Sequence, residues 1–180
     1  MARALLIIDI QNDYFPGGAF PLVEPEAAAA NAAALLAAFR ASGEPVVHLQ
    51  HLSGPEDPFF VPGTPGVEIH DSVAPADGET VLQKAEPNGF LGTGLEEELR
   101  GREVEELVVA GMMSSMCVDA TVRAAADKGF AVRLVHDACA APDLEFGGRT
   151  IEGAAVHGAF MAALGSAYAT LVSARELTSA

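Results

Sequence analysis

The 180-residue sequence contains no tryptophan, only two cysteines, and only ten lysine and arginine residues. Two cysteines cannot form a disulfide framework, and this usage is typical of a reducing compartment such as the cytoplasm. The few basic residues stand against 25 acidic ones, which gives a formal net charge of −15. A surface of that sign repels phosphate backbones and anionic lipids. The composition therefore predicts a cytoplasmic protein whose partners include neither nucleic acid nor membranes.

Long apolar runs are missing as well. The N-terminal run 4–8 ends at Asp9 and is too short for the apolar region of a signal peptide. The apolar segment 154–169 is interrupted by histidine, glycine and serine, which predicts a buried helix rather than a membrane span. The length suffices for one domain with a sizeable core. Because no repeat or linker divides the chain, we expect a single domain over residues 1–180.

Short apolar segments alternate with alanine-rich segments along the chain. Apolar runs with β-branched members are typical of buried parallel strands, and alanine-rich stretches that stop near glycine are typical of helices. This alternation predicts a three-layer α/β fold with a Rossmann-like, mostly parallel sheet of about six strands and helices on both faces. The expected strands are 4–8, 45–49, 80–84, 107–110, 131–135 and 167–172. Helices are expected over 26–41, 93–100 and 149–164, and a further one follows a turn at Gly111 and ends at Gly129. The expected helix 93–100 begins with a Thr93–Glu96 capping box.

Cys117 lies just after the predicted strand 107–110, where the next helix begins. Ligands of open α/β sheets bind at the carboxyl ends of the strands, beside such helix starts. A thiol in the first helical turn meets unpaired N–H groups and the positive end of the helix dipole, and both favour the thiolate. The alternative is that Cys117 is a small buried apolar side chain, which is the interpretation that we give to Cys139.

Two further reactive side chains end predicted strands. Asp9 follows strand 4–8, and Lys84 ends strand 80–84. A carboxylate, an amine and a thiol that converge at one sheet edge suit thiol-based acyl transfer. The carboxylate takes the thiol proton and returns it to a leaving amine, while the ammonium stabilises both anions. Backbone N–H groups in the turn before Cys117 can receive the oxyanion of a tetrahedral intermediate.

The motifs in segments 5–15 and 111–121, with Lys84, Phe90 and Thr93 between them, resemble those of the isochorismatase-like cysteine hydrolases. That family includes nicotinamidases and N-carbamoylsarcosine amidohydrolases, and the resemblance covers nearly the whole chain. It implies that Asp9, Lys84 and Cys117 form a catalytic triad. It also implies a non-proline cis peptide before Met113 and an oxyanion hole made by the N–H groups of Met113 and Cys117.

The cysteine favours one chemistry within this family. Isochorismate hydrolysis cleaves a vinyl ether by acid chemistry and needs no thiol, so Cys117 favours hydrolysis of a C–N bond of a small amide or carbamoyl compound through a thioester. Two alternatives stay open: a vinyl-ether hydrolase with Asp9 as the acid, and a non-catalytic binding protein. Other residues near the triad are candidates for substrate contacts or for packing. They are Gln11, Phe15, Asn88, Phe90, Ser114 and Met116.

We expect neither a metal nor another cofactor. Nicotinamidases carry an Asp-x-His metal pattern after the second strand, but segment 46–53 of this chain reads VVHLQHLS, which lacks the carboxylate and argues against nicotinamide as the substrate. A metal held by His48, His51 and His70 is the alternative.

The region 51–78 has no clear periodicity, and loops of this length in a compact domain are usually functional. It is therefore a candidate lid or subunit interface, in which Phe59, Phe60 and Val61 either line a pocket or anchor the loop. The family resemblance also implies a homo-oligomer, either a dimer or a tetramer.

Overall fold

The structure, a computed structural model, describes residues 2–179. Its centre is a six-stranded sheet with the order β3-β2-β1-β4-β5-β8, in which every pair is parallel. The chain leaves β1 toward β2 on one side and reaches β4 on the other, so the order reverses beside β1. The strands are β1 (Arg3–Ile8), β2 (Val46–His51), β3 (Thr80–Lys84), β4 (Glu106–Met112), β5 (Ala131–Ala140) and β8 (Thr170–Val172).

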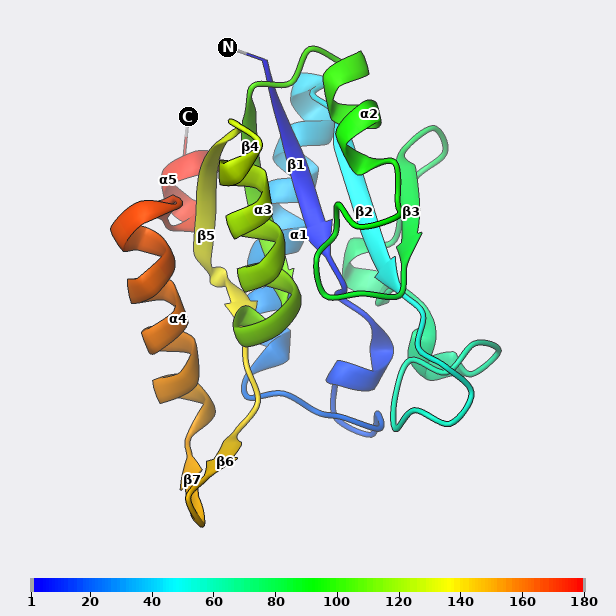
Figure 1. Cartoon of the computed structure of the whole chain (residues 1–180). Coiled ribbons are helices and arrows are strands. Elements are labelled where there is room, and N and C mark those ends of the chain that lie inside the picture. Colours follow the sequence, from blue (N-terminus) through cyan, green and yellow to red (C-terminus); the bar gives the residue numbers. More distant parts are fainter. Residues whose placement is uncertain (1, 180) are drawn as a thin grey trace.

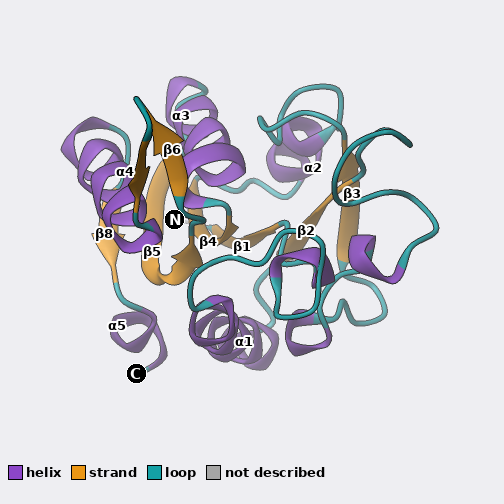
Figure 2. Ribbon diagram, turned by 90° about the horizontal axis from the view of Figure 1, so that it is seen from below, coloured by secondary structure: helices purple, strands orange, loops and turns teal. Residues whose placement is uncertain are grey.

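Helices cover both faces of this sheet, as Figures 1 and 2 show. One face carries α1 (Pro25–Ser42) and α5 (Ala174–Thr178), which contribute to one apolar core. The other carries α2 (Leu95–Gly101), α3 (Asp119–Asp127) and α4 (Gly153–Ala167), which contribute to a second core. The predicted three-layer α/β fold is therefore confirmed.

The helix α4 differs from the buried helix predicted for this segment. Only one side of it is buried, through Gly153, Val156, Met161 and Leu164, and most of its other residues are exposed. Within residues 2–179, no helix combines the length and the apolarity that a membrane crossing requires.

A short antiparallel hairpin precedes α4 and was not predicted. Strands β6 (Leu144–Phe146) and β7 (Arg149–Ile151) pair around Gly147 and Gly148, both of which have positive φ. Two consecutive residues with positive φ are what a tight hairpin turn requires. The predicted helix start at residue 149 is therefore wrong, and the hairpin extends away from the sheet (Figure 1).

Other boundaries shift for local reasons. The helix α4 continues through Ala167, so the last strand begins at Thr170 rather than at 167. The predicted capping box is wrong, because Gly94 caps α2 and the Thr93 hydroxyl donates to the carbonyl oxygen of Gly89. Strand β5 runs to Ala140 and includes the buried Cys139, as expected for a core residue.

The long loop after β2 is anchored to the body by its aromatic residues. Phe60 is fully buried, and its ring lies 4.6 Å from that of Tyr14, which follows β1. The segment also contains two short 3-10 turns, Pro65–Val67 and Asp71–Val73. Phe60 is thus an anchor of the loop rather than a pocket wall.

Strand β4 runs two residues past Ala110 before it turns, so the turn predicted at Gly111 is wrong. Gly111 pairs with Ile8 across the central β1–β4 ladder and has a φ of +149°. A Cβ at this position would collide with the carbonyl oxygen of Ile8. Only glycine therefore allows the two central strands to lie this close.

We expect Gly111→Ala to lower the free energy of unfolding by about 3 kcal/mol or more, because it adds both strain and a backbone clash. Urea unfolding measures the change. Gly101→Ala, at the end of α2, is the matched control, because a Cβ there meets open space, and its effect should stay within about 1 kcal/mol. Equal effects of the two substitutions would contradict the explanation.

Candidate active site

The three residues of the predicted triad lie close together, at or just after the ends of three strands. Asp9 follows β1, Lys84 ends β3, and Cys117 lies in the turn after β4. The Nζ atom of Lys84 lies 2.7 Å from Oδ2 of Asp9 and donates a hydrogen bond to Sγ of Cys117 at 3.3 Å. All three residues are at least 95% buried. The structure thus brings together the carboxylate, the ammonium and the thiol.

The backbone at Asp9 adopts a rare conformation. Its φ is +49°, in the left-handed region that aspartate tolerates better than most residues do. Its N–H still donates to the carbonyl oxygen of Leu49 on β2, so the sheet continues up to this residue. Backbone strain of this kind is common at functional sites and persists where the surroundings fix it.

A wide turn carries Cys117. The peptide bond between Met112 and Met113 is cis, and residues Ser114–Val118 then form one π-helical turn before α3. The carbonyl oxygen of Met113 accepts hydrogen bonds from the N–H groups of both Met116 and Val118. Cys117 therefore lies in this turn, two residues before α3, and not in the first turn of α3 as predicted.

Burial governs the ionisation of this site. It raises the pKa of the Cys117 thiol well above its ordinary value, and the charge of Asp9 raises this pKa further, while Lys84 opposes both effects. The thiol is therefore protonated at neutral pH, so the thiolate expected from the helix start is not the resting form. Burial also raises the pKa of Asp9, and the charge of Lys84 lowers it.

One oxygen of Asp9 is left without a partner. Oδ2 lies beside the Lys84 ammonium, but Oδ1 is buried and has no hydrogen-bond partner within residues 2–179. Such an atom is costly in a stable interior. Perturbed and incompletely paired carboxylates are common where a protein moves protons.

His51, which the sequence analysis names only as an alternative metal ligand, is a member of this site. It ends β2 directly opposite Lys84, and its Nδ1 lies 2.9 Å from Nζ of Lys84. The same ammonium also donates to the carbonyl oxygen of Glu86 at 3.1 Å. The predicted strand 45–49 ends two residues before His51, so the sequence pattern indicates a loop position for His51 and not its pairing opposite Lys84.

The three candidate metal-binding histidines do not gather. His48 pairs with Glu79 at 2.9 Å, and His70 contacts the Ser72 hydroxyl at 2.8 Å. Within the described part of the chain, the one group with metal-ligand spacing consists of Asp9, His51 and Cys117, whose donor atoms all lie within 4.8 Å of one another. The Lys84 ammonium contacts all of these side chains. Its positive charge repels a metal cation, so this donor set does not fit a metal.

Cys117 lines a cavity of about 270 Å³. Its walls are mostly aromatic or apolar, and its polar side chains are neutral or acidic. Of the predicted pocket residues, Met116 alone lines it. The full lining consists of Tyr14, His51, Ser53, Asp57, Pro58, Phe59, Ala85, Pro87, Met116 and Cys117.

The other predicted pocket residues have different surroundings. Gln11 is fully buried and binds the backbone of His51 and Val67. Ser114 is also fully buried, donates to the carbonyl oxygen of Ala140 and contacts His157. Asn88 accepts a hydrogen bond from the N–H of Phe90, whose ring stacks on Phe130.

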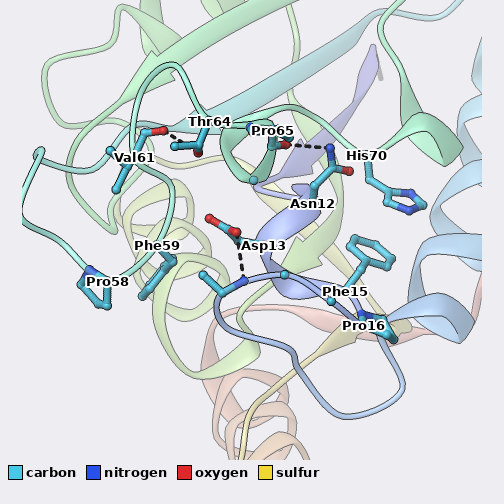
Figure 3. Close-up of a pocket in the computed structure, with 14 residues that line it drawn as sticks. Asn12, Asp13, Phe15, Pro16, Pro58, Phe59, Val61, Thr64, Pro65 and His70 are labelled. Carbon is cyan, nitrogen blue, oxygen red and sulfur yellow. Dashed lines mark hydrogen bonds between the residues drawn. The ribbon is translucent and has the colours of Figure 1, made fainter.

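A separate, larger hollow of about 760 Å³ lies on the other side of Pro58 and Phe59, which line both spaces. Figure 3 shows this hollow, in which the rings of Phe15 and His70 face each other at 3.7 Å. The predicted pocket residue Phe15 therefore lines this hollow and not the cavity at Cys117. Asp13 accepts hydrogen bonds there from two loop N–H groups, so its carboxylate organises the loops.

Comparison with known proteins identifies the family. A family model for the isochorismatase domain matches residues 3–165. The chain belongs to the isochorismatase family. The uncharacterised isochorismatase family protein YddQ of Bacillus subtilis is 52% identical over 172 residues, which cover 95% of this chain and 96% of that protein. A solved isochorismatase-family structure from Oleispira antarctica has a TM-score of 0.96 and 49% identity, and the match covers 99% of this chain and 97% of that one.

Several relatives within this hydrolase family carry the names of hydrolases or amidases. A streptothricin hydrolase of Streptomyces noursei is 42% identical over 79% of this chain, and the match spans 51% of that protein. The nicotinamidase/pyrazinamidase of Mycobacterium tuberculosis is 34% identical over 75% of this chain and 84% of its own length. The N-carbamoylsarcosine amidase of Thermoplasma acidophilum has a TM-score of 0.83 at 26% identity, covering 97% of each chain.

The two charged neighbours of Cys117 should shift its pKa in opposite directions. Asp9→Asn removes a negative charge and should lower the Cys117 pKa by about 1 to 2 units, whereas Lys84→Met removes a positive charge and should raise it. The rate of iodoacetamide labelling as a function of pH measures both shifts. Mass spectrometry separates Cys117 from the buried Cys139, which is an internal reference. Shifts of the same sign would contradict the electrostatic account.

Proposed function

We propose that this isochorismatase-family hydrolase cleaves a C–N bond of a small amide or carbamoyl compound through a thioester at Cys117. The observation that carries the proposal is the hydrogen bond from Lys84 to Sγ of Cys117, made by an ammonium that is also paired with Asp9. A buried thiol with a base and a cation beside it suits nucleophilic catalysis.

The first step forms the thioester. The thiol proton of Cys117 moves to the Asp9 carboxylate while Sγ attacks the carbonyl carbon of the substrate. Because the resting thiol is protonated, its proton must leave before or during the attack. The N–H groups of Met113 and Cys117 stabilise the oxyanion. When the C–N bond breaks, Asp9 returns its proton to the nitrogen, and the amine leaves.

The second step releases the acyl group. A water molecule gives a proton to Asp9 and attacks the thioester carbonyl carbon. Collapse of this intermediate breaks the C–S bond, and Sγ takes the proton back from Asp9 as the acid departs. Lys84 stabilises the carboxylate in one half of the cycle and the departing thiolate in the other.

The vinyl-ether alternative has one observation in its favour. Burial raises the pKa of Asp9, which suits a general acid. This chemistry gives no role to the hydrogen bond on Cys117, however. A non-catalytic binding protein would be favoured by a broken triad, and the distances of 2.7 and 3.3 Å argue against it.

The cavity supports a small substrate. Its volume of about 270 Å³ and its aromatic side chains, Tyr14 and Phe59, suit a compact organic molecule. The names of the amidase-type relatives support hydrolysis of a C–N bond. The Lys84 ammonium, which repels a cation from Asp9, His51 and Cys117, supports chemistry without a metal.

Replacement of the nucleophile or of the base should abolish turnover. We expect Cys117→Ala and Asp9→Asn each to lower kcat/KM by about 10³-fold or more, because the residues of such a triad act as a unit. An ammonia-release screen over a library of small amides, ureas and carbamoyl compounds identifies a substrate and measures the loss.

Cys139→Ala is the matched control, because it removes the other cysteine and should keep most of the activity. Thermal unfolding establishes that each variant is folded. Wild-type amide turnover by Cys117→Ala would refute the proposal, and turnover of a vinyl ether retained by that variant would favour the alternative.

A further inference from the structure

The hydrogen bonding of His51 fixes its tautomer. An ammonium group has only protons to donate, so Nδ1 of His51, at 2.9 Å from Nζ of Lys84, must be the acceptor. The imidazole is therefore neutral and carries its proton on Nε2. His51 also lines the cavity that contains Cys117, so its ring lies where substrate is proposed to bind.

The Lys84 ammonium has more acceptors around it than it has protons. Its three N–H groups face Oδ2 of Asp9, Sγ of Cys117, Nδ1 of His51 and the carbonyl oxygen of Glu86. Asp9 and Cys117 change charge during the proposed reaction, whereas His51 and the Glu86 carbonyl do not. The unchanging pair can therefore hold the ammonium in place while the other two exchange a proton.

We propose that His51 is a positioning residue that holds the Lys84 ammonium against Sγ of Cys117 throughout the reaction. The proposal rests on the proposed function and deepens it. Without the His51 acceptor, the Glu86 carbonyl alone opposes movement of the ammonium toward the Asp9 carboxylate and away from sulfur. A displacement of about 1 Å at a reacting centre can cost about 100-fold in rate.

The chain fixes His51 through a second residue. The N–H of His51 donates to Oε1 of Gln11 at 2.8 Å, and Nε2 of Gln11 donates back to the carbonyl oxygen of His51 at 2.9 Å. Gln11 is fully buried and follows Asp9 by two residues. The loop that carries the proposed base thus also fixes the backbone of the residue that holds the ammonium.

The charges around His51 keep it neutral. Lys84 faces it from β3, Asp57 from the long loop, Asp9 from the end of β1 and Cys117 from the turn after β4. Burial, together with the charge of Lys84, lowers the pKa of His51 to about 4, although the charge of Asp57 opposes this shift. His51 therefore accepts the hydrogen bond at any pH well above this value.

The tautomer can be measured without any substrate. Nitrogen-15 NMR of histidine-labelled protein should show His51 with an unprotonated Nδ1 and a protonated Nε2 from neutral pH down to about one unit above its pKa. His51→Asn identifies the signal by its loss. A proton on Nδ1, or a cationic ring at neutral pH, would overturn the proposal whatever the activity of the protein.

Two substitutions test the role in turnover. His51→Leu removes the acceptor and should lower kcat by about 10- to 100-fold, with KM changed by less than about threefold. His51→Asn offers an oxygen near the position of Nδ1 and should recover most of that loss. Equal losses in the two variants, or wild-type kcat in His51→Leu, would overturn the proposal.

The pH profile of Cys117 labelling gives a further readout, because a residue with only a packing role would not move it. It should shift in His51→Leu and stay in place in His51→Asn. Failure of the proposed function is distinguishable, because it appears as amide turnover by Cys117→Ala and leaves the His51 tautomer and the labelling profiles unaffected.

Discussion

The buried ion pair between Asp9 and Lys84 is the interaction on which this site depends. Both side chains are completely shielded from solvent, and two charges removed from water are stable only when further polar contacts compensate them. Cys117, His51 and the Glu86 carbonyl provide those contacts to the ammonium. The pair requires the strand order β3-β2-β1-β4, which brings residues from distant parts of the sequence to one edge of the sheet.

Much of this arrangement follows from local sequence. The apolar runs predict all six strands of the central sheet, with β3 predicted at its exact bounds. Asp9, Lys84 and Cys117 were identified because each is a reactive side chain at or just after a strand end, and parallel strands bring such ends together. The family motifs then gave these residues their expected roles.

The features that the sequence did not predict depend on contacts between distant segments. His51 acquires its place from the β2–β3 register, and the cavity walls come from the long loop and from turns that have no periodic pattern. Burial and the charge of Asp9 raise the pKa of Cys117 and keep the thiol protonated. Its position near a helix start, considered alone, predicts a lowered pKa and a thiolate. The β6–β7 hairpin depends on backbone angles at Gly147 and Gly148.

The central claim is that Cys117 becomes covalently acylated during turnover. Mass spectrometry of protein that is rapidly quenched in acid while it hydrolyses an amide tests this claim most directly. The account predicts that the peptide containing Cys117 gains the mass of the acyl group, that the peptide containing Cys139 does not, and that the adduct disappears when the substrate is exhausted. Steady turnover with Cys117 unmodified at every time point, under conditions in which a synthetic thioester survives the quench, would contradict it.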